Sequence, residues 1–264
     1  MIDPEQRTLS ATVTEAFYRQ DFLQAPTNDF VELSRSVREG TVVDMGGGCG
    51  FFAQGLRDQA GLRVRVVDMD PRSVAACRQA GIEAECGHAL HPRFVGDEAV
   101  VYFNLILHHL VAHDEPVTRA LRLSALRVWH GKAKALFVNE YIYESFLATA
   151  SGWLIYQITR NQLLSMIGKA ISRVVPSFRA NTFGVGVRFR AHNGWRNLFT
   201  EAGYDVAAIR AGRAEPVSPP SRSLLIRQIR RDSFWLTTSC GRKDAGSAGA
   251  PSGSTDSCSL RDDD

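Results

Sequence analysis

One acid and four glycines within seven positions are the residues whose types and spacing point most directly to chemistry. Asp44 ends a run of β-branched residues, and Gly46, Gly47, Gly48 and Gly50 follow it in the stretch DMGGGCG. Glycine permits backbone angles that a Cβ forbids, and it lets a ligand lie against main-chain N–H groups. The stretch therefore predicts a strand, a tight turn and a helix, with a nucleotide-type ligand bound at the turn.

The same glycines fit two classes of cofactor. Gly48, Gly50 and Ala53 satisfy the G-x-G-x-x-A pattern of folds that bind NAD or FAD. A phosphate-binding loop gains nothing from the negative charge of Asp44, whereas a cationic ligand without phosphate gains from it. S-adenosylmethionine (SAM) is such a ligand, so Asp44 favours SAM.

A second acid is spaced for contact with a ribose. Asp68 lies in the strand pattern VVDMD, 22 residues after Gly46. In a βαβ unit the end of the second strand lies beside the first glycine turn, so a carboxylate there can accept both ribose hydroxyls. We expect Asp68 and the neighbouring Met69 to bind the cofactor. His88 follows the third strand, where a side chain can reach the edge of an adenine; a surface role is the alternative.

Polar residues also gather where two further strands are predicted to end. The predicted fourth strand (100–107) contains Phe103 and Asn104 and precedes His108 and His109, and the predicted fifth strand (134–141) ends in Glu140 and Tyr141. Ligands of open α/β sheets bind outside the carboxyl ends of the strands. The two histidines, Glu140 and Tyr141 are therefore candidate catalytic residues, and a histidine near its ordinary pKa suits a general base. Packing or helix capping by the histidines is the alternative.

The elements that position these residues alternate between strand and helix patterns. Helices are expected from about residue 51 to 60, over 71–80 and from 116, and strands over 62–68 and 82–86 in addition to those named above. A helix, a glycine stop and two strands close the domain, the last strand being 221–231. This order predicts an α/β fold: a doubly wound, mostly parallel, seven-stranded Rossmann-like sheet with an antiparallel terminal hairpin.

The sequence predicts a helical cap, one main domain and a tail. The cap (1–38) should hold helices at 8–24 and 29–38, separated by a break at Pro26, Thr27 and Asn28. The domain (39–231) carries an insertion at 142–190 that is rich in bulky apolar residues, which favours a helical lid over an apolar substrate; a homodimer surface is the alternative, and the two can coexist. Residues 232–264 have the composition of a disordered tail.

Bulk composition narrows the classes of partner. The 264 residues carry a formal charge of only +3 and no dense basic block, which disfavours nucleic acid. Five cysteines form no CxxC pair and have no metal-ligand spacing, so we expect no metal site and a reducing cytoplasm. No signal sequence and no apolar run of transmembrane length is present, so membrane insertion is not expected.

Four motifs together resemble the class I SAM-dependent methyltransferases of the small-molecule type. VVDMGGGCG is similar to their first motif, VVDMD to the acidic end of their second strand, FNLILHHL to their fourth-strand segment, and GWRNLFTEAGYDV with SLLIRQI to their last helix and reversed hairpin. The resemblance covers about residues 39–230. It implies that Asp44 and the glycine loop contact the methionine part of SAM, Asp68 the ribose hydroxyls, and Phe103 and Asn104 the cofactor near its methyl group.

The sequence departs from the family at one position. Many relatives have Gly-Asp-Ala after the third strand, where this chain has Gly87, His88 and Ala89. Either His88 replaces the carboxylate that contacts adenine or the backbone makes the contact. The Asp-Pro-Pro-Tyr type motif of methyltransferases acting on nucleic-acid bases is absent after the fourth strand.

Three functions are compatible with these patterns. The first is a methyltransferase that acts on oxygen or nitrogen of a small, partly apolar molecule, and it is the one we adopt as the working prediction. The second is an NAD- or FAD-linked oxidoreductase, which shares the glycines but not the fourth-strand segment or the terminal hairpin. The third is a catalytically silent binding partner on a methyltransferase-like fold, against which the intact glycine loop argues.

Overall fold

The computed structural model describes residues 20–35, 37, 39–161 and 186–239. The helices of these ranges are α2 (Gln20–Leu33), α3 (Phe51–Ala60), α4 (Pro71–Gln79), the 3-10 helix η1 (Leu107–His109), α5 (Glu115–Arg127), α6 (Ala150–Arg160), α8 (His192–Glu201) and α9 (Pro219–Arg222). The strands are β1 (Thr41–Met45), β2 (Val64–Asp68), β3 (Glu83–Cys86), β4 (Glu98–Asn104), β5 (Ala135–Ser145), β6 (Tyr204–Ala211) and β7 (Ile226–Thr238).

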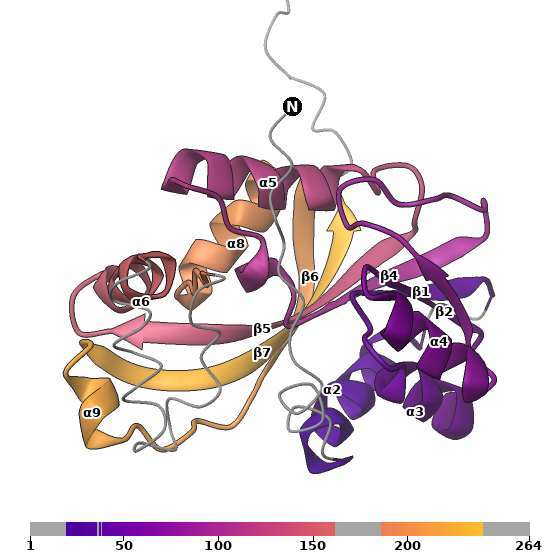
Figure 1. Cartoon of the computed structure of the whole chain (residues 1–264), viewed down its shortest axis with the longest axis horizontal. Helices are drawn as coiled ribbons and strands as arrows, with labels where there is room; N and C mark the ends of the chain where they lie inside the picture. The colour runs from indigo at the N-terminus through magenta and orange to yellow at the C-terminus, as the bar shows by residue number, and fades with distance from the viewer. Residues whose placement is uncertain (1–19, 36, 38, 162–185, 240–264) are drawn as a thin grey trace, which may run out of the picture.

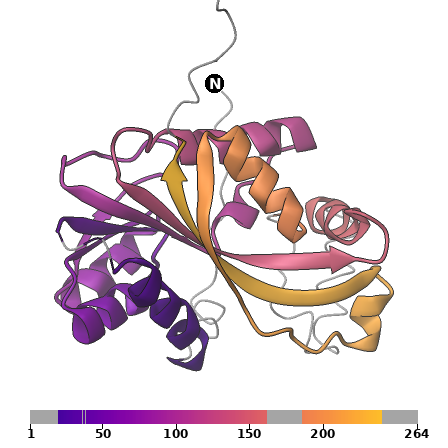
Figure 2. The same ribbon diagram turned by 180° about the vertical axis from the view of Figure 1, so that it is seen from behind.

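Within the described residues, seven strands form one twisted sheet in the order β3-β2-β1-β4-β5-β7-β6. The first five pair in parallel, and β7 pairs antiparallel with both β5 and β6. Helices α2, α3 and α4 cover one face, while α5 and α8 cover the other (Figures 1 and 2). The predicted doubly wound sheet with a reversed terminal hairpin is confirmed.

The central strands are apolar because both of their faces are covered. Alternate residues of each strand enter one of two cores. Val43, Val101 and Val138 pack with residues of α5 and α8, whereas Val42 and Val100 pack with residues of α2, α3 and α4. The continuous apolar runs in the sequence therefore report double burial.

The predicted helix break at Pro26–Asn28 is wrong, because α2 runs through Pro26 without interruption. Thr27 and Phe30 are buried, and the ring of Phe30 packs edge-on against Phe52 and Phe137. This packing against α3 and the sheet offsets the hydrogen bond that a proline inside a helix removes. The predicted helix at 8–24 lies mostly outside the described residues.

Two predicted strand ends are also wrong. β4 ends at Asn104 rather than at 107, because Leu105 has a left-handed φ of 55° and turns the chain into η1. β5 continues to Ser145, so the expected insertion does not begin at 142; the side chain of Ile142 is fully buried in the sheet core. Apolar content alone did not distinguish strand from the turn that follows it.

The predicted start of the tail at 232 is wrong as well. β7 extends to Thr238, and Phe234, Trp235 and Leu236 are buried in the two cores. Polar Asp232 and Ser233 interrupt the apolar pattern, although both are fully buried in the structure. The part of the insertion at 162–185 and the stretch from 240 onward lie outside the described residues. No helix within the described ranges is long and apolar enough to cross a membrane.

Candidate active site

The glycine loop between β1 and α3 is held against two neighbouring strand ends. Gly46 donates its N–H to Val67 at the end of β2 over 2.7 Å. A Cβ at Gly46 would collide with the side chain of Ile106, in the turn between β4 and η1. Gly46, Gly48 and Gly50 all have left-handed φ angles, between 54° and 77°, which side chains other than glycine rarely adopt. The sequence thus shapes the loop for close backbone approach.

Asp44 lies beneath this loop and is fully buried. Neither of its carboxyl oxygens has a hydrogen-bond partner among the described residues. Burial raises the pKa of Asp44 from 3.8 to about 8, and the nearby Asp68 adds to the rise. A Cβ at Gly47 would collide with the Asp44 carboxyl group. An unpartnered buried carboxyl group is costly, so this position is suited to a ligand that brings a donor or a positive charge.

Asp68 is fixed by the backbone around it. Its Oδ2 accepts the N–H of Gly48 over 2.9 Å, and its Oδ1 accepts the N–H of Asp70 over 2.8 Å. Burial raises the pKa of Asp68, while backbone hydrogen bonds from Asp70, Gly48 and Met69 act in the opposite direction. An ionised carboxylate can accept about four hydrogen bonds, so Asp68 is pre-positioned with acceptor capacity left for a ligand. Asp70, as expected, caps α4 by accepting the N–H of Arg72.

Two residues, Met69 and His88, are predicted near the base of a nucleoside; Met69 is exposed and His88 is half-buried. Met69 follows Asp68 and has 42% of its surface exposed. His88 lies in the turn after β3, where its Nδ1 accepts the N–H of Leu90 over 3.0 Å. The hydrogen bond fixes the orientation of the imidazole ring beside the glycine-loop end of the sheet.

The end of β4 contributes one amide at the strand end and one ring in the core. Phe103 is fully buried among the core residues shared with α5, so its side chain offers no surface to a ligand. Asn104 follows at the strand end, and its buried Oδ1 has no hydrogen-bond partner among the described residues. Met45 of β1 and Phe103 of β4 are register partners, so Asn104 lies next to the start of the glycine loop.

Glu140 and His108 form the most strongly connected pair of the site. The fully buried Glu140 carboxylate accepts the backbone N–H of Leu107 over 2.7 Å and of His108 over 3.3 Å through Oε1. Its Oε2 lies 2.7 Å from Nδ1 of His108. Glu140 therefore caps η1 and orients the His108 imidazole at the same time.

His109 and Tyr141 have shifted pKa values that limit their chemistry. Burial lowers the pKa of His109 well below its ordinary value, and His108 and Arg122 contribute in the same direction. Burial raises the pKa of Tyr141 to about 12. At neutral pH His109 is therefore an uncharged imidazole and Tyr141 a protonated phenol.

An aromatic wall that sequence analysis missed stands beside His108. The ring of Phe189 stacks on His108 with centroids 4.8 Å apart, and it stacks on Tyr143 with centroids 4.2 Å apart. Tyr141 contacts Phe189 edge-on. The alternation of polar and apolar residues in VRFRAH signals a strand-like segment there, but nothing in it indicates which ring Phe189 meets.

The structure thus brings five of the predicted polar residues to one edge of the sheet in two groups. The first group surrounds the glycine loop with Asp44, Asp68 and Asn104, and the second is the η1 group of His108 and Glu140. Ile106 links the groups because it packs on Gly46. No cluster of histidine, cysteine, aspartate or glutamate suited to a metal ion occurs among the described residues.

Comparison with known proteins finds solved structures of similar fold but no similar sequence. No family model matches the chain, and no curated protein matches it in sequence. The chain is 17% identical to the mitomycin 7-O-methyltransferase MmcR, with a TM-score of 0.50 over 87% of this chain and 54% of that one. It is 13% identical to PigF, solved with SAH, with a TM-score of 0.53 over 86% and 59%. The chain therefore spans little more than half the length of either protein.

A third solved structure matches over most of both chains. The cyclase SpnF is 11% identical, with a TM-score of 0.53 over 81% of this chain and 80% of that one. Taken with the strand order and the motifs, these similarities show that the chain has the class I SAM-dependent methyltransferase fold. Because one similar protein is named as a cyclase, the fold by itself does not decide the reaction.

Proposed function

We propose that the chain binds SAM along the glycine loop and transfers its methyl group to an oxygen or nitrogen atom of a small, partly apolar acceptor. The observation that carries the proposal is Asp44, a buried carboxyl group without a hydrogen-bond partner among the described residues, placed directly against the glycines. A cationic cofactor would supply the missing partner. The similarity in fold to PigF, which was solved with SAH, supports the same cofactor class.

Each part of the cofactor has a candidate contact. Asp68 keeps acceptor capacity for the ribose hydroxyls, and the exposed Met69 offers an apolar surface beside it for the adenine ring. His88 is proposed to border the adenine from the turn after β3. Asn104 is proposed to accept from the methionine end of the cofactor, near its methyl group, whereas the burial of Phe103 leaves it a packing role.

The oxidoreductase alternative fits this geometry less well. A dinucleotide lays its pyrophosphate against the glycines and the start of the following helix. Here the carboxyl group of Asp44 lies at Gly47, and that of Asp68 lies at Gly48. An acid under the glycines, as Asp44 is, would repel a pyrophosphate, whereas it attracts a sulfonium or an ammonium group; Asp68 suits the ribose of either cofactor.

For methyl transfer, the protein mainly has to position the acceptor and exclude water from the site. SAM, when bound, supplies an electrophilic methyl group that an acceptor atom attacks in line. The chain's own residues must hold the acceptor on that line in a water-poor site. The half-buried Tyr141 and Tyr143, which pack on the buried Phe189, are proposed to receive the apolar part of the acceptor.

His108 is the proposed base when the acceptor is a hydroxyl. Glu140 holds its Nδ1 as the donor, so the neutral ring keeps Nε2 as the atom that accepts a proton. His109 remains neutral and Tyr141 protonated at physiological pH, which suits packing and hydrogen-bond donation.

Three described cysteines are free thiols, in keeping with the cytoplasm expected from the sequence.

Calorimetric titration with SAM tests the cofactor assignment. We expect one site per chain in the wild type and, for Asp68→Ala, a weakening of about 10- to 100-fold, since hydrogen bonds to a charged group are worth about 1.5–3 kcal/mol. Asp58→Ala is the matched control, because Asp58 is exposed on α3 and pairs there with its neighbour Arg57. Binding that is equally tight in Asp68→Ala, or no heat at millimolar SAM, contradicts the assignment.

A labelled-methyl assay with a panel of phenols, carboxylic acids and amines tests the reaction. We expect label in a product with the wild type and a loss of turnover without loss of SAM binding in His108→Gln. Label transfer that is unchanged in His108→Gln contradicts the role given to His108. A protein that binds SAM but transfers no label to any acceptor supports the silent-partner alternative.

A further inference from the structure

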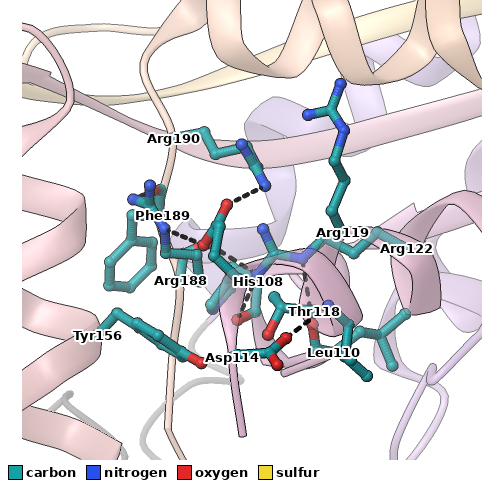
Figure 3. Close-up of polar contacts among 12 residues, drawn as sticks. His108, Leu110, Asp114, Thr118, Arg119, Arg122, Tyr156, Arg188, Phe189 and Arg190 are labelled. Carbon is teal, nitrogen blue, oxygen red and sulfur yellow. Dashed lines mark hydrogen bonds and ion pairs between the residues drawn. The ribbon is translucent and has the colours of Figure 1, made fainter. Parts of the chain in front are cut away.

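A cluster of buried arginines lies beside the η1 group and has no part in the proposed methyl transfer. Arg122 comes from the middle of α5, while Arg188 and Arg190 come from the segment that precedes α8 (Figure 3). All three side chains are buried, with 0%, 5% and 9% of their residue surfaces exposed. Lysine and arginine are almost never buried without a partner, so each guanidinium group calls for a balancing acceptor. We call these three residues the arginine cluster.

Two of the three guanidinium nitrogens of Arg122 have hydrogen-bond acceptors. Its Nε donates to the carbonyl of Leu110, and its Nη2 donates to the carbonyls of His108 and Arg188, over 2.9–3.2 Å. The guanidinium also lies over the ring of Trp195, 5.4 Å from its centroid. The remaining nitrogen, Nη1, is buried and has no hydrogen-bond partner among the described residues.

Glu115 is the only carboxylate that the described residues place in hydrogen-bond contact with the cluster. Its two oxygens accept from Nε of Arg188 over 2.8 Å and from Nη2 of Arg190 over 2.7 Å. The Nε of Arg190 is buried and, among the described residues, unpartnered. The Glu115 side chain itself is 36% exposed, so the cluster opens to solvent at this residue.

The charges of the cluster do not balance. Three guanidinium groups face one carboxylate, and the next acid, Glu140, already binds η1 and His108 with both oxygens. Burial lowers the pKa of Arg122 to about 9, and the neighbouring Arg190 contributes to the fall. Figure 3 shows the guanidinium groups of Arg122 and Arg190 facing one another across the cluster. Like charges so placed repel strongly away from water, unless an anion joins them.

We propose that the arginine cluster binds one small oxyanion of the carboxylate type, next to Glu115, through the unpartnered nitrogens of Arg122 and Arg190. A planar carboxylate suits guanidinium donors because both can form parallel hydrogen bonds. The proposal does not depend on methyl transfer. Its alternative is a purely structural clamp, in which Glu115 fastens the segment before α8 onto α5 and no external anion binds.

Sodium formate is the probe that distinguishes the anion site from the purely structural clamp. We expect calorimetry to show saturable formate binding to the wild-type chain, measured against sodium chloride at equal ionic strength. Arg190→Gln should abolish the binding. Arg119→Gln is the matched control, since Arg119 lies on α5 together with Arg122 but its side chain is 37% exposed and pairs with Glu201. Formate heat that is absent in the wild type, or present equally in Arg190→Gln, overturns the proposal.

Glu115→Gln provides a second test, in which the anion site and the structural clamp predict different responses to formate. Removing the charge of the carboxylate that contacts the cluster should make formate bind about tenfold more tightly, because this carboxylate no longer competes. Formate should also restore part of the Tm that Glu115→Gln loses, while chloride does not. A clamp without an anion site predicts a lower Tm that formate leaves unchanged.

The same proteins distinguish a free anion from a carboxylate carried by the acceptor. Acceptors tested as matched acid and amide pairs should show a preference for the acid, measured as kcat/KM, that Arg190→Gln removes if the acceptor supplies the group. A site for a free ion gives formate binding with no such preference. Failure of the formate titrations refutes the site even when SAM binds and methyl transfer occurs.

Discussion

Replacing Asp44 by asparagine should make the cofactor-free protein more stable at high pH while weakening SAM binding. Asp44 is fully buried and its two oxygens lack hydrogen-bond partners among the described residues. Such a group is tolerated in its protonated form and costs free energy once it ionises. Asparagine has the same shape and no ionised form, so it removes the cost and also removes the counter-charge for a cationic cofactor.

The magnitude follows from the pKa of Asp44, which is raised from 3.8 to about 8. A folded-state pKa above the unfolded value means that the folded protein holds the proton more tightly. The free energy of unfolding is therefore highest below pH 4 and falls as the pH rises through 8. At 1.36 kcal/mol for each pH unit, the full loss is about 6 kcal/mol, as an upper limit.

Urea unfolding at pH 5 and pH 9 measures this effect. The wild type should lose several kcal/mol more than Asp44→Asn between the two pH values, and Asp58→Asn should behave like the wild type because Asp58 is exposed. SAM binding to the wild type near pH 7 should release close to one proton per site, seen as a dependence of the calorimetric heat on the buffer. Equal pH dependence in the wild type and Asp44→Asn would refute the reasoning.

Three further changes test other parts of the structure. Gly47→Ala places a Cβ against the Asp44 carboxyl group, so it should lower the unfolding free energy by about 1–3 kcal/mol, and the double variant with Asp44→Gly should recover part of the loss in a urea titration. Glu140→Gln weakens the acceptor that caps η1 and holds His108, so kcat should fall by at least ~10-fold with little change in the SAM dissociation constant; an unchanged kcat speaks against the pair. A chain that stops after residue 231 loses the buried Phe234 and Trp235 and should fail to fold, whereas one that stops after residue 239 should keep the near-UV circular dichroism of the full chain; folding of the shorter chain would contradict the assignment of β7.

The sequence predicted the elements around the glycine loop well, because local chemistry determines them. Glycines at left-handed positions, Gly61 after α3 and the cap of Asp70 on α4 each act over a few residues. The double burial of the central strands is likewise visible as unbroken apolar runs. The sheet followed from the motifs and their spacing, and the reversed terminal pair of strands lies at the edge beyond β5, as those motifs implied.

The errors arose where distant contacts outweigh local preference. α2 passes through Pro26 because Phe30 is buried among rings from three other elements. β7 passes through Asp232 because that carboxylate accepts from Arg230 and His192 inside the fold. The sequence shows only a proline and an acid at these positions. The hydrogen bond that joins the two elements, from Ser233 to Asp29, spans 204 positions of the chain.

Local sequence reveals some of the site residues, while others depend on distant contacts. Asp44 and Asp68 were identifiable from spacing alone, since the fold brings the ends of β1 and β2 together. Phe189 and the arginine cluster were not, because their partners come from η1, α5 and β5, and nothing local marks them. Arg122 sits in an otherwise ordinary helical pattern, and only the fold shows that its Nη1 is buried without a partner among the described residues.

A crystal structure with S-adenosylhomocysteine (SAH) bound is the most direct test of the central claim, that the glycine loop and its two acids form a SAM site. The account predicts the cofactor along residues 44–50, with both ribose hydroxyls within hydrogen-bond distance of the Asp68 carboxylate and the amino group on the Asp44 side of the loop. SAH bound elsewhere, or bound here with Asp68 turned away from the ribose, would contradict it.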